Sequence, residues 1–339
     1  MLAWFSLSLF YFIPVVFQQH IYPNYLIGDF TVFLSPAIFF LFFKFYPPYF
    51  FSERMKKLFI FFLIINSLLA PFTANKLWGS SYMSRTPDGF DPPNIMLLAC
   101  LSFVFFNTHY FSRMLFSYLG ILFFLGLSFL SQIRTNALSY LFLITAQLLN
   151  YPFLSRNNYS ALKRLFLLIL PFVVVLQVFL FSSFLPDLIG RKNRFLEIGT
   201  GDTSTLNRLN EAHDVVKNVF YSRNFFVMAF GFGHGACYAP DLSLPEPNLT
   251  EQNLVHNVHI FLFLVLFRYG LFGVSIFLYI ACFIGRRAFF LLKSSFSWDF
   301  VMSFYFLFSL VNCLFRNIMI DPFFSIAAAY LLTIPGKRM

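Results

Sequence analysis

Long apolar runs separated by short polar connections make up most of this chain. Runs of about 17–25 predominantly apolar residues can cross a bilayer as helices, and about ten runs come near this length. They cover approximately residues 2–17, 30–46, 58–74, 94–110, 113–131, 136–153, 164–185, 257–284, 299–319 and 322–334. The pattern predicts an all-α fold, a polytopic transmembrane helix bundle with about ten spanning helices.

One connection, residues 186–256, is much longer than the others. A long segment between spans commonly carries function. Within it, the stretch from Thr205 to Phe220 predicts a short amphipathic helix at the membrane surface, because its apolar residues recur at helical spacing. These apolar positions are Leu206, Leu209, Ala212, Val216 and Val219. The predicted domains are N-terminal transmembrane helices at 1–185, a large periplasmic loop at 186–256 and C-terminal transmembrane helices at 257–339.

Composition agrees with a lipid environment. Hydrophobic residues make up 59% of the chain, charged residues make up 11%, and the mean hydropathy is +0.72. Soluble domains are about one quarter charged, so they are a poor match. The net charge of +10 comes from short clusters between apolar runs, which form no continuous basic groove for nucleic acid. Cys100, Cys282 and Cys313 lie in apolar runs and Cys237 in the loop, so neither a disulfide framework nor a CxxC metal site is predicted.

The basic residues predict the orientation of the spans, because Lys and Arg are retained on the cytoplasmic side. With the N-terminus inside, the cytoplasmic set is Lys44, Arg54, Lys56, Lys57, Arg113, Arg156, Lys163, Arg164, Arg286, Arg287, Lys293, Lys337 and Arg338. The short connections on the other side then hold Lys76, Arg85, Arg134 and Arg316. We therefore expect a multi-pass membrane protein with both termini cytoplasmic and the long loop on the opposite side.

Three arginines in polar segments are candidates for binding an anion. Arg134 lies in a very short turn between two apolar runs, where a guanidinium needs a partner or a wet cavity. The alternative is a side chain that snorkels to phospholipid headgroups. Arg208 lies in the predicted loop helix, with an intra-helix pair to Glu211 as the alternative. Arg223 adds a further cation to the same loop.

Between the loop helix and the next span, Gly231-Phe232-Gly233-His234-Gly235 predicts irregular backbone and tight turns. This run is not a dinucleotide fingerprint, because no buried strand precedes it and no βαβ unit surrounds it. We expect the turn to be structural and His234 to tolerate substitution.

Two histidines and a further arginine lie where the next apolar run begins. His256 and His259 are spaced so that they can share a helix face, which makes a metal pair one alternative, but neither an HExxH motif nor a third ligand accompanies them. An imidazole near neutrality is also the usual general base. Arg268 falls about three helical turns beyond His256, where an ionisable group needs an inward-facing partner.

Three features in this order resemble the superfamily of membrane O-antigen ligases and O-antigen polymerases. The turn Ser131-Gln132-Ile133-Arg134 is similar to the family's Ser-Arg turn before an apolar helix. Arg208 ahead of Gly231-Phe232-Gly233 is similar to a loop arginine before a Gly-x-Gly turn. His256-Asn257, followed by Gly270-Leu271-Phe272-Gly273, is similar to a His-Asn helix start with a Gly-x-x-Gly element, and His259 is the alternative counterpart of that histidine.

The resemblance implies an integral-membrane glycosyltransferase that polymerises undecaprenyl-diphosphate-linked repeat units of O-antigen or another surface polysaccharide at the periplasmic face. It implies that Arg134 and Arg208 hold the donor diphosphate, since guanidinium forks match phosphate oxygens. His256 would then take the acceptor proton as the third catalytic residue. The further substrate-binding candidates are Asn257, His259, Arg223 and Arg268. Neither a cofactor nor a metal is expected.

Two other functions fit the same residues. An O-antigen ligase would pass the same donor to lipid A-core by identical chemistry. A lipid or glycan transporter would bind the same anion without breaking a bond, although no internal repeat is visible in the sequence. The expected partners are the lipid-linked glycan donor, a glycan or lipid A-core acceptor, membrane lipid, and a chain-length regulator or flippase; nucleic acid is not among them.

The orientation can be tested by labelling. Ser243→Cys in the long loop is expected to react with a membrane-impermeant maleimide in intact spheroplasts, because the loop is predicted to lie outside. Reaction only after permeabilisation would reverse the orientation and remove the periplasmic site.

Overall fold

The computed structural model describes residues 23–46, 203–222, 224–238, 254–255, 258, 260–292, 297–313 and 322–334, together with 61, 65, 100–101, 112–113 and 115–121. Apart from an isolated antiparallel bridge between Tyr238 and Val255, the regular structure in these residues is helical. The all-α class is therefore confirmed for the part of the chain that the structure describes. The predicted spans at 2–17, 58–74, 94–110, 113–131, 136–153 and 164–185 fall wholly or largely outside it.

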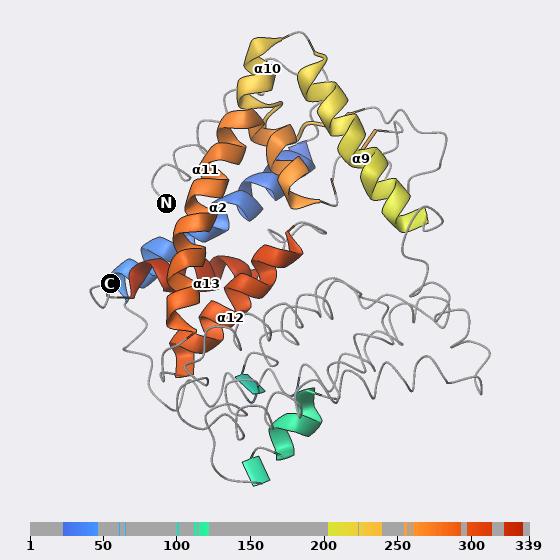
Figure 1. Ribbon diagram of the computed structural model, residues 1–339. Helices are drawn as coiled ribbons and strands as arrows, with labels where there is room; N and C mark the ends of the chain where they lie inside the picture. Colours follow the sequence, from blue (N-terminus) through green and yellow to red (C-terminus); the bar gives the residue numbers. More distant parts are fainter. Residues whose placement is uncertain are drawn as a thin grey trace, which may run out of the picture. The chain divides into compact units, whose positions relative to one another are not determined.

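The named helices follow the chain in the order shown in Figure 1. They are α2 (Pro23–Phe45), α9 (Thr203–Phe220), α10 (Phe225–Phe230), α11 (Phe261–Leu291), α12 (Ser297–Asn312) and α13 (Pro322–Thr333). Four of them occupy predicted spans. Helix α2 begins before the predicted residue 30, α11 begins and ends several residues later than expected, and α12 ends at Asn312 instead of residue 319. The chain divides into two compact units, the first made of Met1–Pro48, Gly199–Arg286 and Ser309–Met339, the second of Tyr49–Ile198 and Arg287–Phe308.

Two of the described helices are long and apolar enough to cross a membrane. They are the Leu26–Phe45 part of α2, with 20 residues and a hydropathy of 2.0, and α11, with 31 residues and a hydropathy of 2.1. Length and apolar composition alone do not distinguish such a helix from a buried core helix of a soluble protein. The apolar helices α12 and α13 have 16 and 12 residues, fewer than the about 20 that a full span requires.

The second part of α11 buries one face and exposes apolar residues on the others. Its buried positions recur every three or four residues, at Gly273, Phe277, Ala281, Ile284 and Ala288, which defines a single face. A surface helix in water carries polar residues opposite its buried face. Apart from Arg286, the large exposed residues of α11 are instead apolar or aromatic: Leu271, Phe272, Leu278, Tyr279, Phe283, Phe289 and Phe290. This distribution suits a helix that faces lipid better than one that faces water.

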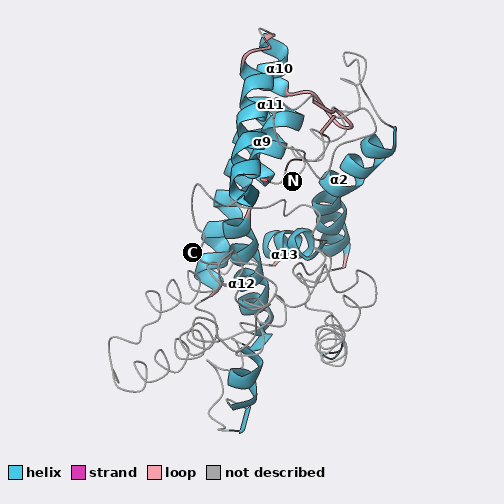
Figure 2. Ribbon diagram, turned by 90° about the vertical axis from the view of Figure 1, so that its right-hand side faces the viewer, coloured by secondary structure: helices cyan, strands magenta, loops and turns pink. Residues whose placement is uncertain are grey.

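Small residues let α13 pack closely against α2 (Figure 2). The buried residues of α13 include a run of three alanines, Ala327 to Ala329, which allow two helix backbones to approach. The hydroxyl oxygens of Ser35 and Ser325 lie 2.8 Å apart, so a hydrogen bond joins the two helices. Further along, the rings of Phe43 and Tyr330 meet edge to face. Helix α2 is thus held along its length inside the first compact unit.

The predicted loop helix is confirmed as α9, and one of its faces is buried against the rest of the described structure. Leu209 is exposed, whereas Ala212, Val215 and Val219 are buried. The buried face also includes the carboxylates of Glu211 and Asp214, each of which has an interaction partner. Hydrophobic spacing identified the helix but did not show that Glu211 and Asp214 would be buried, because a buried face can include polar groups once they are satisfied.

Helix α11 breaks at Gly270, whose φ of 63° and ψ of −162° are not helical. In Figure 1 its two parts run in different directions below α10. Gly231, which ends α10, also has a positive φ and packs directly against the break: a Cβ on Gly231 would lie 2.6 Å from the backbone nitrogen of Gly270. The sequence spacing predicted one continuous helix here, so the break is a correction. Glycine adopts helical and positive-φ conformations with similar ease, and the hydropathy of the sequence does not show which of the two it adopts.

The backbone contact between Gly231 and Gly270 predicts intolerance to any side chain. We expect Gly231→Ala and Gly270→Ala each to destabilise the protein by at least about 1–3 kcal/mol, the cost of forcing a non-glycine residue into this backbone region. Gly285→Ala in the same helix is the control, because its Cβ would make an ordinary contact of 3.6 Å with Leu310. Melting temperatures of the purified protein measure the difference, and equal melting temperatures for the three variants would contradict the contact.

Candidate functional site

Asp29 and Arg268 form an ion pair inside the first compact unit. The Nε atom of Arg268 lies 2.9 Å from Oδ2 of Asp29, and the exposed fractions of the two side chains are 0% and 12%. A buried charge without a counter-charge is strongly unfavourable, so each group makes the burial of the other tolerable. The inward-facing partner that the sequence required for Arg268 is therefore Asp29. The pair joins the N-terminal part of α2 to α11.

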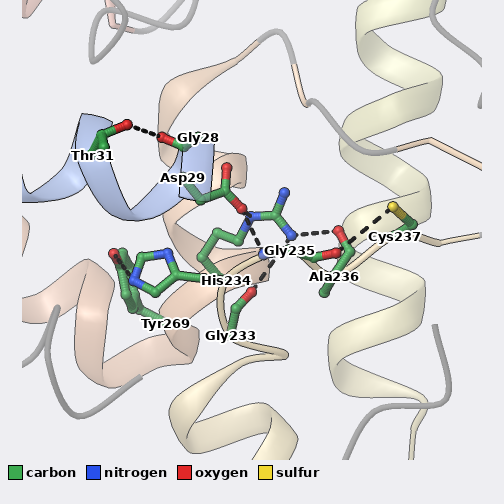
Figure 3. Close-up of polar contacts among 10 residues, drawn as sticks. Gly28, Asp29, Thr31, Gly233, His234, Gly235, Ala236, Cys237 and Tyr269 are labelled. Atoms are coloured by element: carbon green, nitrogen blue, oxygen red, sulfur yellow. Dashed lines mark hydrogen bonds and ion pairs between the residues drawn. The ribbon is translucent and has the colours of Figure 1, made fainter. Parts of the chain in front are cut away.

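The glycine turn, residues 231–235, closes around this ion pair. The backbone N–H of Gly235 donates a hydrogen bond of 2.8 Å to Oδ2 of Asp29. The Nη1 atom of Arg268 donates to the carbonyl oxygens of Gly233 and Ala236. Figure 3 shows the carboxylate of Asp29 directed toward this turn. Together, the two charges connect α2, the turn and α11.

The turn also replaces hydrogen bonds that the break in α11 removes. In a continuous helix, the carbonyl groups of Phe267 and Arg268 would accept from residues four positions later. Here they accept from the N–H groups of Phe232 (2.8 Å) and Gly233 (2.9 Å). The break is therefore satisfied by backbone groups of the turn, as buried polar groups require.

Positive φ angles at Gly231, Gly233 and Gly235 confirm the predicted irregular turn. At Gly235 a side chain would also come within 3.1 Å of Leu26 in α2. The turn therefore needs glycine both for its backbone angles and for its close approach to α2.

His234 is fully buried at the centre of an aromatic cluster. Its Nε2 atom lies 3.2 Å from the hydroxyl oxygen of Tyr269, as Figure 3 shows. The ring centroids of Phe30 and Phe33 lie 6.2 and 5.7 Å from that of the imidazole. The Tyr269 side chain in turn covers Gly273, where an added Cβ would clash with Cβ of Tyr269. The expected tolerance of His234 to substitution is inconsistent with this burial. The control variant in an activity assay therefore has to be at an exposed position.

All four cysteines are free. Burial raises the pKa of the Cys237 thiol to about 11; Arg268 opposes the rise and Asp29 adds to it. The thiol is therefore protonated near neutral pH, where only the thiolate is a nucleophile. Cys237 is a poor candidate for nucleophilic chemistry and contributes little background when Ser243→Cys is labelled.

The chain is also tethered on either side of the predicted histidine motif. Tyr238 and Val255 exchange two backbone hydrogen bonds of 3.0 and 2.8 Å, which connect the end of the glycine turn to the residue before His256. Val255 and Val258 are buried, and α11 begins at Phe261. His256, Asn257 and His259 themselves lie outside the described residues.

Of the predicted site residues, the structure describes two, Arg208 and Arg268. Arg208 lies on α9, is partly buried and has an interaction partner. Arg268 forms the ion pair with Asp29, and we call this pair together with the glycine turn around it the clamp. The guanidinium of Arg268 is fully buried there and its charge is balanced. In this geometry Arg268 helps to hold the fold, and its predicted contact with substrate stays a prediction. Arg134 and Arg223 are outside the described part of the chain.

Asp29 was missed as a candidate by sequence reasoning. It lies at the edge of the apolar run 30–46, directly before its first residue. The available signal was the rule that ionisable groups near or within spans pair with one another. Applied to Arg268, the rule asks for an acidic residue beside another apolar run, and Asp29 meets that condition.

Comparison with protein-family models, with curated proteins and with solved structures finds no match for this chain.

The ion pair can be tested by removing one charge and then both. Asp29→Asn is expected to destabilise the protein by about 3–5 kcal/mol, because it leaves the guanidinium of Arg268 buried without its counter-charge. Asp29→Leu combined with Arg268→Met removes both charges and is expected to recover much of the loss. Lys44 is an exposed basic residue of α2, the helix that carries Asp29, so Lys44→Ala serves as the control and should have little effect on stability.

Thermal unfolding of the purified variants measures these differences. If the double variant loses as much stability as its two single changes added together, Asp29 and Arg268 do not act as a pair.

Proposed function

We propose that this chain is an integral-membrane glycosyltransferase that polymerises undecaprenyl-diphosphate-linked oligosaccharide repeat units of a surface polysaccharide. It acts at the periplasmic face of a multi-pass bundle of about ten spans in the bacterial inner membrane. The O-antigen ligase reaction, which transfers the same kind of donor to lipid A-core, is the closest alternative.

The observation that carries the proposal is the contact between two glycine elements of the resemblance. Gly231 of the Gly-x-Gly turn packs on Gly270 of the Gly-x-x-Gly element, and each position excludes a Cβ. The backbone N–H of Gly233 donates to the carbonyl group of Arg268, two residues before Gly270. Each glycine motif therefore has a structural reason for its residue type, and the two form one unit. This contact supports the proposal that the Gly-x-Gly turn and the Gly-x-x-Gly element belong to one site, as the resemblance implies.

The position of the break supports an active face at the membrane edge. From Leu271 to Leu291, α11 provides about 20 residues, or about 30 Å, which by itself suffices to cross the hydrocarbon core. The exposed Lys44 and Arg286 lie toward the C-terminal ends of α2 and α11, whereas Asp29 and Arg268 lie toward their N-terminal ends. Under the positive-inside rule, both helices run inward from the ion pair. The clamp then lies near the outer interface, where charge and irregular backbone cost less than at mid-membrane.

The chemistry follows from the nature of the donor. The anomeric carbon of the lipid-linked glycan forms a bond to the acceptor hydroxyl oxygen, while its bond to the diphosphate oxygen breaks. His256 takes the hydroxyl proton, and the diphosphate leaves with the bonding electron pair. Arg134 and Arg208 stabilise the negative charge that develops on it, because charge-assisted bonds to phosphate strengthen as that charge grows.

Transport without bond formation is the second candidate, and the broken helix α11 favours it. Transporters commonly place substrate sites at interrupted helices. In α11, however, the carbonyl groups of Phe267 and Arg268 at the break are taken by the glycine turn. These groups are therefore satisfied within the protein, which favours the enzyme.

The deciding experiment supplies purified protein in vesicles with an undecaprenyl-diphosphate-linked oligosaccharide. Polymerisation produces a ladder of longer glycans and releases undecaprenyl diphosphate. Lipid A-core that acquires the glycan would identify a ligase instead. Movement of the donor between leaflets with neither product would replace the enzyme by a transporter.

Single substitutions test the assigned roles. Arg208→Ala, Arg134→Ala and His256→Ala are each expected to slow transfer by about two to three orders of magnitude, the usual contribution of a preorganised charge stabiliser or a general base. Arg134→Lys should fail nearly as badly as Arg134→Ala, because an ammonium cannot bind two phosphate oxygens as a fork.

His256→Ala is expected to leave donor binding intact, whereas Arg208→Ala should weaken it. Arg286→Ala, at an exposed position toward the other end of α11, is the control and should retain activity. Normal glycan ladders from all three site variants, with normal membrane insertion, would show that these residues do not form the site.

A further inference from the structure

The turn between α9 and α10 exposes an unusual number of aromatic side chains. Phe220, Tyr221, Phe225, Phe226 and Phe230 are each between 36% and 78% exposed. We call these five residues the aromatic tip. Contiguous exposed apolar surface of this kind marks a site that contacts either a membrane or another protein.

Charge distinguishes these two occupants. From Val215 to Phe230 the chain carries Lys217 and Arg223 but neither Asp nor Glu. Lys217 is exposed, one turn before Phe220. Aromatic rings interleaved with cations, without acidic residues, match the interfacial layer of an anionic bilayer, where rings lie at headgroup level and cations meet phosphate.

The aromatic tip is also continuous with the apolar surface of α11. The ring of Phe230 meets that of Phe272 edge to face at 5.9 Å, and Leu271 and Phe272 are exposed at the start of the spanning-length part of α11. Both views show α10 beside this end of α11 (Figures 1 and 2). The surface of the aromatic tip therefore continues into the surface that faces lipid in the proposed bundle.

The length of α10 allows the aromatic tip to reach the headgroup layer of the membrane. Helix α10 has six residues and so is about 9 Å long, and its C-terminal end is held at Gly270. The polar layer on each side of the hydrocarbon core is about 5–7 Å thick. Side chains as large as Phe225 and Phe226 can bridge the remaining gap, because α10 begins within one short helix of the membrane edge.

We infer that the aromatic tip inserts into the outer headgroup layer of the membrane and anchors the long loop there. This inference rests on the proposed membrane placement of α11. An anchored loop would hold Arg208 on α9 close to the layer in which a lipid-linked diphosphate travels.

Depth-dependent fluorescence quenching tests the anchor in the full-length protein. The background replaces the native Trp4, Trp78 and Trp298 with phenylalanine, and Phe226→Trp then reports on the aromatic tip. The protein is reconstituted in phosphatidylcholine and phosphatidylglycerol vesicles that contain lipids with a nitroxide near either the headgroup or the chain end. Phe283→Trp, an exposed position well inside the spanning part of α11, is the matched control.

The expected result is opposite depth profiles. The tryptophan at position 226 should be quenched more by the shallow nitroxide and be protected from aqueous iodide, whereas that at position 283 should be quenched more by the deep nitroxide. Full iodide quenching at 226 without nitroxide quenching would overturn the anchor and assign the aromatic tip to a protein partner. Absence of nitroxide quenching at 283 would overturn the membrane placement of α11, and with it the proposed function.

Discussion

A buried carboxylate and a buried guanidinium hold together three parts of this protein that are distant in the chain. Asp29 lies in α2 and Arg268 lies in α11, and backbone groups of the turn at 231–235 hydrogen-bond to both side chains. Such a pair adds little net stability, because both charges lose their hydration. Its importance lies in the cost of any alternative arrangement, which would leave one charge buried alone. The pair therefore selects one arrangement of these segments.

The break in α11 depends on the same arrangement. A helix interrupted at Gly270 leaves carbonyl groups without their usual donors, and N–H groups of the glycine turn supply them. The turn can approach only because neither Gly231 nor Gly270 has a side chain. The ion pair and the hydrogen bonds thus support one another: the charges hold the turn in place, and the turn satisfies the break. The end of the long loop is attached to the helix that follows it.

The surfaces of the described helices suggest how this clamp relates to a bilayer. Beyond the break, α11 exposes mainly large apolar side chains along a length that matches the hydrocarbon core. The aromatic tip consists of exposed rings, and the sequence from Val215 to Phe230 has two basic residues and no acidic one. The contact between the rings of Phe230 and Phe272 joins these two surfaces. In the proposed placement, the apolar surface of α11 meets the hydrocarbon core and the aromatic tip meets the headgroup layer.

The sequence by itself determined what depends on local pattern. Spacing of apolar residues predicted α9 and the positions of four apolar helices, glycine content predicted an irregular turn, and the isolated charge of Arg268 predicted a buried partner. Only the tertiary structure decided that this partner is Asp29, that Glu211 and Asp214 lie on the buried face of α9, and that α11 breaks where the turn docks. The reason is physical. Hydropathy and periodicity report the preference of a segment for its surroundings, whereas a counter-charge or a backbone donor can come from any segment that packing brings close.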